Sequence, residues 1–224
     1  MHGRAPPWSK PAVRLARAGL AMTDETPEDV HLVGRRVRLR PILQRDYEML
    51  LQIELSEQLG PYWRLRGRTR APDSYSQNLW GGVLAQFIVI RRDTEQALGM
   101  VTVYNADVMD GHASFSAAKF LRADRSTLIL QGSILMLDYS FAYFPLRKIY
   151  LEVNEYNLSQ FSSGVGRILK PEGVLRAHSF AAGRYWDKHI FAIYRDDWSQ
   201  RAPEFRRLVL GQTPSVQSGD HDEP

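Results

Sequence analysis

The first third of the chain shows a strand period followed by a helix period. Residues 35–40 alternate polar and apolar side chains before Pro41, which predicts a half-buried strand that ends where a ladder donor is missing. The period then changes, and the pattern predicts a helix over residues 46–59 with an acidic N-cap. The side chains expected to face inward from it are Leu50, Ile53 and Leu55. A second short helix is expected over residues 74–84.

Three strand-like segments follow one another in the middle of the chain. Residues 86–91, 98–104 and 112–120 have the pattern of strands, and turn-forming residues separate them at 93–94 and 107–111. Strands joined by such short turns pair side by side in opposite directions. We therefore predict three consecutive antiparallel strands.

The last part of the chain mixes both periods. Residues 125–144 predict a long amphipathic helix, 147–153 a buried strand and 157–169 another helix. Two more strands are expected over 171–179 and 186–194, before an amphipathic segment. The apolar stripe of the long helix consists of Leu130, Ile134, Leu137 and Phe141. This order, β-α-α-β-β-β-α-β-α-β-β, is typical of a single α/β domain. We place that domain at residues 31–208, after a disordered basic leader (1–30) and before a flexible acidic tail (209–224).

Charge and cysteine content restrict the classes of function. The formal net charge is +4, with 29 basic and 25 acidic residues. Four basic residues and no acidic ones precede Met22, so the rest of the chain carries 25 of each and gives no reason to expect a nucleic-acid partner. The leader reads as an extension, with Met22 as an alternative start. The chain has no cysteine, which excludes disulfides, zinc thiolates and a cysteine nucleophile and favours the cytoplasm. No apolar run is long enough to span a membrane.

Several short motifs occur in a definite order between Leu32 and Trp198. They are Val37–Pro41 with Asp46, Leu98–Gly99, Asp138–Phe141, Leu146–Val153, Asn157, Glu172–Gly173, Gly183–Asp187 and Phe191–Trp198. In order and spacing they resemble the GNAT superfamily of acyl-CoA N-acyltransferases. The closest resemblance is to its Rim-type branch, the ribosomal-protein serine/alanine acetyltransferases.

The resemblance implies a fold and a reaction. The fold is a mixed seven-stranded sheet, splayed between its fourth and fifth strands and flanked by helices on both faces. The pantetheine arm of acetyl-CoA, or of another acyl-CoA, pairs in the splay like an extra strand. A glycine-rich loop before the long helix holds the pyrophosphate. An amine of a peptide or small molecule then attacks the thioester directly, and no metal takes part.

The sequence departs from that family at the residues that bind phosphate and move protons. Thr127 and Ile129 occupy the positions where the family has its loop glycines, and Ser114 occupies the position of its glutamate on strand four. Gly164 occupies the position of the tyrosine that serves as general acid in related branches. Two further functions therefore stay open besides N-acyltransfer. One is a GNAT-fold binding or regulatory module without catalysis, and the other is a biosynthetic enzyme that takes its thioester from an acyl carrier protein.

The resemblance assigns candidate residues to each role. Asn157 is expected to hold the pantetheine or an ordered water, with helix N-capping as a competing explanation, and Ser159 supplies a hydroxyl beside it. The residues expected to contact the cofactor are Phe120, Leu121, Arg125, Ser126, Thr127, Leu128, Ile129 and Asn157. Those expected to contact the acceptor are Trp63, Arg64, Arg66, Tyr104 and Asn105.

His112 is the candidate general base, because the pKa of imidazole suits proton transfer near neutral pH. Asp107 and Asp110 lie close to it in sequence and would allow a metal site, although a hairpin turn explains these residues better. The expected partners are an amine acceptor, alternatively an acyl carrier protein, and a second copy of the chain in a homodimer. Neither a membrane nor nucleic acid is expected to bind.

Overall fold

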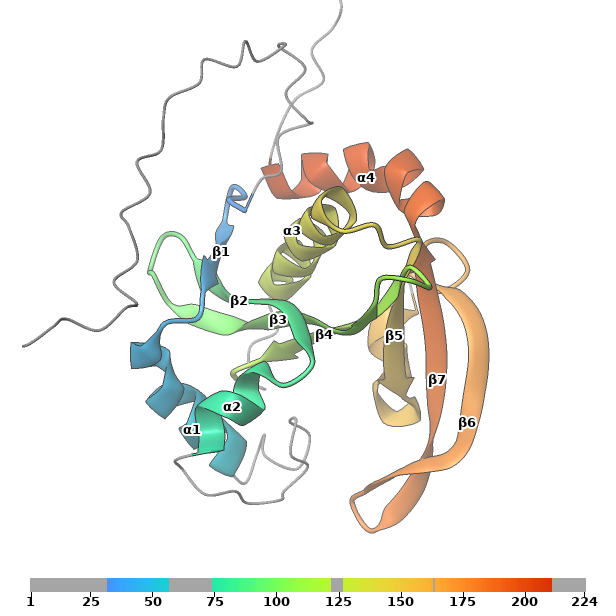
Figure 1. The fold of residues 1–224 in the computed structure, drawn as a ribbon, viewed down its shortest axis with the longest axis horizontal. Coiled ribbons are helices and arrows are strands. Elements are labelled where there is room, and N and C mark those ends of the chain that lie inside the picture. The colour runs from blue at the N-terminus through green and yellow to red at the C-terminus, as the bar shows by residue number, and fades with distance from the viewer. Residues whose placement is uncertain (1–31, 57–73, 122–126, 163, 211–224) are drawn as a thin grey trace, which may run out of the picture.

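The computed structural model describes residues 32–56, 74–121, 127–162 and 164–210. A seven-stranded mixed sheet with the order β1-β2-β3-β4-β5-β7-β6 forms its centre (Figure 1). All neighbouring strands are antiparallel except β4 and β5, which are parallel. The strands are β1 (Val37–Pro41), β2 (Val83–Arg91), β3 (Ala97–Asp107), β4 (His112–Lys119), β5 (Lys148–Asn154), β6 (Lys170–Ala181) and β7 (Arg184–Tyr194). The predicted antiparallel trio corresponds to β2, β3 and β4 and is confirmed.

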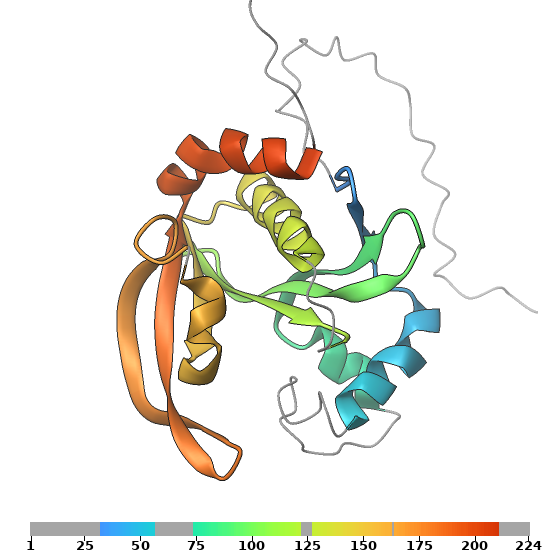
Figure 2. The same ribbon diagram turned by 180° about the vertical axis from the view of Figure 1, so that it is seen from behind.

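Helices pack against both faces of this sheet (Figures 1 and 2). They are the short 3-10 helix η1 (Gln44–Asp46), α1 (Tyr47–Leu55), α2 (Tyr75–Trp80), α3 (Leu128–Tyr143), the 3-10 helix η4 (Glu155–Phe161) and α4 (Arg195–Leu210). The helices α1 and α2 lie on one face of the sheet, which we call the α1 face. The long helix α3 crosses the opposite face, and α4 packs on α3.

The main core lies between α3 and the sheet. Val89, Val101, Phe115 and Ile149, from four different strands, pack there against α3. The helix approaches β2 so closely that a Cβ on Gly132 would lie 2.6 Å from a methyl group of Val89. Only glycine permits that approach without displacing a neighbour, so this position fixes how α3 crosses the sheet.

A buried polar contact joins α3 to α4. The carboxylate of Asp138 accepts hydrogen bonds from Trp198 Nε1 and from Arg206 Nε, both at 2.9 Å. Because an unpaired buried carboxylate would be costly, these donors fix the position of α4 over α3. The helix α4 extends to Leu210, past the expected domain boundary at residue 208.

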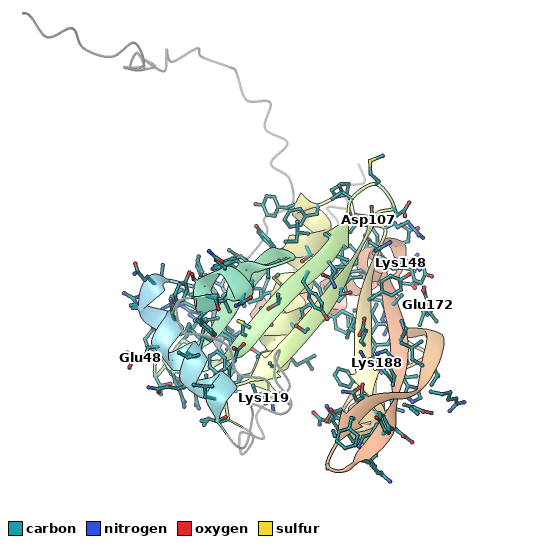
Figure 3. All side chains as sticks on the ribbon, turned by 60° about the horizontal axis from the view of Figure 1, so that its bottom comes forward. Glu48, Asp107, Lys119, Lys148, Glu172 and Lys188 are labelled. Atoms are coloured by element: carbon teal, nitrogen blue, oxygen red, sulfur yellow. The ribbon has the colours of Figure 1, made fainter. Side chains whose placement is uncertain are left out.

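The sheet divides between β4 and β5, as the GNAT resemblance implied. The two strands pair only from His112 with Lys148 to Phe115 with Leu151. Both then continue, β4 to Lys119 and β5 to Asn154, with no recorded pairing between them in the described sheet. We call the point just beyond the Phe115–Leu151 pair the fork. The ends of the two strands beyond it are separated in Figure 3.

The α1 face is apolar on one side of the fork and polar on the other. Next to β1–β3, a second apolar cluster that includes Leu50, Leu79, Ile88 and Met100 packs beneath α1 and α2. On β5 the alternation instead sends Ile149, Leu151 and Val153 into the main core. Consequently the polar side chains of the same strand face the α1 side, and these are Lys148, Tyr150, Glu152 and Asn154.

Several details of the predicted elements were wrong. The second short helix, expected over residues 74–84, ends at Trp80, and β2 begins at Val83. Leu130 is exposed rather than part of the buried stripe of α3, because α4 and the sheet bury other sides of that helix. Leu55 is likewise exposed, at the last turn of α1. The helix expected over residues 157–169 is only the 3-10 helix η4, since the chain turns at Gly164 and at Gly166, where φ is +78°.

Within the described residues, no helix combines the length and the apolar character that crossing a membrane requires. Most of the expected leader and tail lies outside the described residues.

Candidate active site

One row of polar side chains crosses the α1 face immediately before the fork. Tyr104 of β3 lies opposite Ser114 of β4, and Ser114 lies opposite Tyr150 of β5. Side chains directly opposite each other in neighbouring strands share a face, so three side chains that carry hydroxyl groups lie on the α1 face there. Tyr104, which was expected to contact the acceptor, therefore lies on the α1 face beside the fork.

Glu152 is the first β5 residue beyond the fork. It follows Leu151, the last residue of β5 that pairs with β4, and its side chain retains 40% exposure. The Nζ of Lys188, from β7, donates to Glu152 Oε2 at 2.8 Å. The Lys188 side chain is only 10% exposed, so this ammonium is largely withdrawn from water. A carboxylate and a primary amine therefore meet where the two strands separate.

A second lysine–glutamate pair lies on the same face, before the fork. Lys148 Nζ donates to both carboxylate oxygens of Glu172 at 2.9 and 2.8 Å, and the hydroxyl of Tyr194 donates to the same carboxylate. The ammonium also lies 4.5 Å from the ring centre of Tyr150 and 5.5 Å from that of Tyr194. This pair links the start of β5 to the edge strand β6 (Figure 3).

The electrostatics of the Lys148 pair are those of a stable ion pair. Burial is the largest influence on each group and disfavours its charged form, but the bonds between them outweigh it. The pKa of Lys148 is therefore raised, through Glu172 and Tyr150, and the pKa of Glu172 is lowered, through Lys148 and Tyr194. The hydrogen bond to Glu172 also raises the pKa of Tyr194. Lys148 consequently stays protonated and is a poor nucleophile.

The N-terminus of α3 follows the far end of β4 in the chain. Thr127 is the exposed N-cap, without a side-chain capping bond, and its carbonyl accepts the first helical hydrogen bond from Leu130 N at 3.0 Å. The amides of Leu128 and Ile129 precede that bond and belong to the helix N-terminus, where anions bind. The side chain of Leu128 is buried, and that of Ile129 packs against Gly99.

The other predicted cofactor contacts are placed less favourably or not at all. The side chain of Phe120 is buried in the cluster beneath α1 and α2, and its amide already donates to Leu98 O at 2.9 Å. Leu121 is exposed. Arg125 and Ser126 lie outside the described residues.

Asn157 and Ser159 lie on η4, which packs on the α3 side of β5 rather than on the α1 face. Asn157 accepts a hydrogen bond from Gln160 Nε2 at 3.3 Å, and Ser159 is exposed. Asn157 does not cap a helix, because the N-cap of η4 is Asn154. Asn157 and Ser159 therefore lie on the opposite face of the sheet from the Glu152 side chain.

His112 lies at the closed end of the β4–β5 pairing, opposite Lys148. The strand rise puts it about 10 Å from Phe115 at the fork. Its ring stands edge-on to Tyr150, with ring centres 5.6 Å apart. The structure therefore does not bring His112 to the point where Glu152 and Lys188 meet.

The potential ligand atoms of Asp107, Asp110 and His112 lie within 4.8 Å of one another. Asp107 Oδ1 accepts hydrogen bonds from the amides of Met109 and Asp110, both at 3.0 Å. Such bonds are those of a turn that a side chain closes, as expected for the hairpin between β3 and β4.

Asn105 ends the straight part of β3 with φ at +49°, and its amide donates to Gly82 O at 2.8 Å. Its backbone role is therefore to hold the β2–β3 pairing where the strand bends. The remaining residues predicted to bind the acceptor, Trp63, Arg64 and Arg66, lie outside the described residues.

The sequence analysis did not single out Tyr150, Glu152 and Lys188, which the structure places beside the fork. The signal was present, because polar Lys148, Tyr150 and Glu152 alternate with Ile149, Leu151 and Val153 in a segment that was predicted only as a buried strand. Such alternation indicates a strand with one polar face, and here that face borders the fork.

Three solved structures with a similar fold are N-acetyltransferases. Spermidine/spermine N-acetyltransferase SpeG from Vibrio cholerae, in complex with manganese ions, has a TM-score of 0.60 and 21% sequence identity, covering 74% of this chain and 96% of that one. Spermidine N-acetyltransferase from Vibrio cholerae, in complex with CoA and spermine, has a TM-score of 0.58 and 18% sequence identity. The match covers 73% of this chain and 98% of that one. A GCN5-related N-acetyltransferase from Brucella melitensis has a TM-score of 0.61 and 17% sequence identity. The match covers 81% of this chain and 86% of that one.

No protein-family model matches the sequence, and no curated protein sequence matches it either. The similarity to these solved structures is therefore a similarity of fold. The parallel β4–β5 pair in a seven-stranded mixed sheet is nevertheless what the GNAT resemblance implied, and the chain has the GNAT fold of these N-acetyltransferases.

Proposed function

We propose that this protein is an acyl-CoA-dependent N-acetyltransferase that acts on a primary amine. The observation that carries the proposal is the fork. Two adjacent strands stop pairing and leave facing main-chain edges at Ser116–Lys119 and Glu152–Asn154. An extended pantetheine arm could pair with those edges as an added strand does.

The position of the fork indicates where the acyl group would lie. A chain that enters between two diverging strands must end where they meet, which is beside Phe115 and Leu151. The other end of the separated β4 strand leads to the N-terminus of α3, where helix amides suit the phosphates. Acetyl-CoA would supply an activated acyl carbonyl at the fork.

The residues at the fork fit the proton transfer that the reaction needs. An ammonium group cannot attack a carbonyl carbon until it loses a proton. Glu152 stands on the α1 face, with a partly exposed carboxylate that already accepts a hydrogen bond from one primary amine, Lys188. In this proposal Glu152 is the general base, and Tyr104, Ser114 and Tyr150 line the acceptor side.

We favour a small aliphatic amine as acceptor. The Lys188 side chain, a primary alkyl ammonium, shows the kind of group that Glu152 accommodates. One of the proteins of similar fold is known in complex with CoA and spermine, which is a small amine. A peptide N-terminus, implied by the Rim-type resemblance, is the competing acceptor.

Calorimetric titration with CoA, followed by a transfer assay, tests the proposal. We expect CoA to bind, and acetyl-CoA to acetylate members of a panel of alkyl amines faster than peptides that begin with serine or alanine. Acetyl-pantetheine in place of acetyl-CoA would reveal a donor site that does not need the adenosine phosphates. Absence of CoA binding to the folded protein would refute the proposal.

A further inference from the structure

Lys188 stands in the position that the proposal above requires of an acceptor amine. Its Cα lies opposite Asn154, on the open side of the fork, and its side chain reaches back along β5 to Glu152. The 2.8 Å contact between Lys188 Nζ and Glu152 Oε2 places a primary amine on the candidate base, beside the point where the acyl group would end. No other amine is recorded on Glu152 among the described residues.

We propose that Lys188 is an internal acceptor, so that the protein acetylates its own Lys188 when it binds acetyl-CoA. This inference rests on the N-acetyltransferase function proposed above. It assigns a modification site to a side chain that is only 10% exposed and that another enzyme would reach poorly. The donor, by contrast, would arrive from within the sheet, through the separated strands.

The step balances without any further reactant. Glu152 takes one proton from the Lys188 ammonium, and the neutral Nζ attacks the acyl carbonyl carbon. A nitrogen–carbon bond forms, and the carbon–sulfur bond of the thioester breaks. The sulfur leaves with the bonding electron pair and takes the second proton of the amine. The products are an amide on Lys188 and free CoA thiol, and Glu152 returns its proton to solvent.

Lys148 shows why the same reaction is not expected at every buried lysine. It is as buried as Lys188, with 9% exposure, but it lies at the closed end of the pairing and donates to both oxygens of Glu172. The raised pKa of Lys148 keeps it protonated. The aromatic rings of Tyr150 and Tyr194 also hold its ammonium in place.

The small number of lysines makes the proposal easy to test. The chain has five, and they are Lys10, Lys119, Lys148, Lys170 and Lys188. Lys170, at 41% side-chain exposure, reports the background of uncatalysed acetylation. Acetylation of Lys148 would show whether burial beside a carboxylate is sufficient for a lysine to be acetylated.

Acetylation of Lys188 would also change the site. The amide is uncharged, so the ion pair with Glu152 would be lost and the carboxylate would become available to a free amine. The modification would thus remove a side chain that competes with the external acceptor for the base.

The experiment is incubation of the full chain with acetyl-CoA and no added amine, followed by intact mass measurement and peptide mapping. We expect one added acetyl group, at Lys188, in excess over Lys170 and absent from Lys148. Glu152→Gln should slow it about a hundredfold, which is within the usual contribution of a general base. Lys188→Arg, which keeps the positive charge, should abolish it.

Calorimetry with CoA on the same wild-type and variant preparations separates the two proposals. If CoA binds and Lys188 is not acetylated faster than Lys170, or if Glu152→Gln acetylates Lys188 at the wild-type rate, Lys188 is not an internal acceptor and the enzymatic function stands. If CoA does not bind the folded protein, both proposals fail. Equal CoA affinity in Glu152→Gln would show that the variant remains folded.

Discussion

Two lysine–glutamate pairs lie on one face of the sheet, and they differ in their hydrogen bonds, in their neighbouring side chains and in the exposure of the carboxylate. Lys148 and Glu172 join β5 to the edge strand, make two hydrogen bonds and are enclosed by tyrosine side chains. Lys188 and Glu152 make a single recorded bond at the fork, and the carboxylate is 40% exposed, against 23% for Glu172.

The difference indicates how one ion-pair chemistry serves two purposes. A largely buried pair that is held by two internal hydrogen bonds is expensive to break and is poorly placed to bind a substrate. A pair with a partly exposed carboxylate can exchange its lysine for another amine at little cost. We therefore expect the Lys148 pair to act on stability and the Lys188 pair to act on catalysis.

The largest expected effect is on the rate of acetyl transfer. Glu152→Gln should lower kcat about a thousandfold, because an amide cannot accept the proton of the attacking ammonium. Glu172→Gln is the matched control, with the same chemical change in the other pair, and should alter kcat far less once the protein is folded. Steady-state assays with acetyl-CoA and an alkyl amine would measure both. Equal losses in the two variants would contradict the division of roles.

For the free energy of unfolding we expect the opposite order, with the larger loss when the Lys148 pair is broken. Lys148→Met leaves the Glu172 carboxylate without its main partner in a largely buried place, which should cost about 3 kcal/mol of unfolding free energy. Lys188→Met leaves Glu152 more exposed to water and should cost about 1 kcal/mol or less. Urea denaturation of both variants measures the difference. A larger loss for Lys188→Met would mean that the fork pair is the structural one.

Much of the fold could be predicted because its elements carry local signals. The three middle strands and the long helix followed from periodicity and turn residues, and the fold class followed from their order together with the family motifs. The details that failed depend on tertiary contacts. The exposure of Leu130 depends on where α4 packs, and no period within α3 contains that information.

The site was harder to predict because its groups come together only through pairing between distant strands. Glu172 reaches Lys148 from a position where the β6–β7 register shifts, between Pro171 and Gly173. Lys188 reaches Glu152 diagonally from the neighbouring strand. Neither contact has a signature along the chain, whereas the alternation within β5 does.

Acid titration should sharpen the comparison through Glu172. Because its pKa is lowered on folding, the carboxylate stabilises the fold above its unfolded pKa of about 4.3, and this stabilisation is lost as pH falls through the lower, folded value. The stability difference between the wild type and Glu172→Gln should therefore be constant near neutral pH and shrink below about pH 4. At alkaline pH, the raised pKa of Lys148 predicts that its contribution declines only above about pH 10.4.

Urea denaturation of the wild type and Glu172→Gln across this pH range provides the measurement. A difference that instead grew on acidification would contradict the sign assigned to Glu172. Arg201 and Glu204, a pair on the surface of α4, offer a comparison for which only a small contribution is expected.

The smallest effects should come from exchanging each lysine for arginine. Lys188→Arg keeps a cation beside the partly exposed Glu152, so unfolding free energy should change by less than about 0.5 kcal/mol. Lys148→Arg must fit a larger planar group between Tyr150 and Tyr194, where the compact ammonium now contacts both rings, and should cost about 1–2 kcal/mol. Parallel urea titrations would measure both changes. Equal tolerance of arginine at the two positions would show that the enclosure around Lys148 is looser than its ring contacts imply, and the contrast between the pairs would then rest on Glu152 alone.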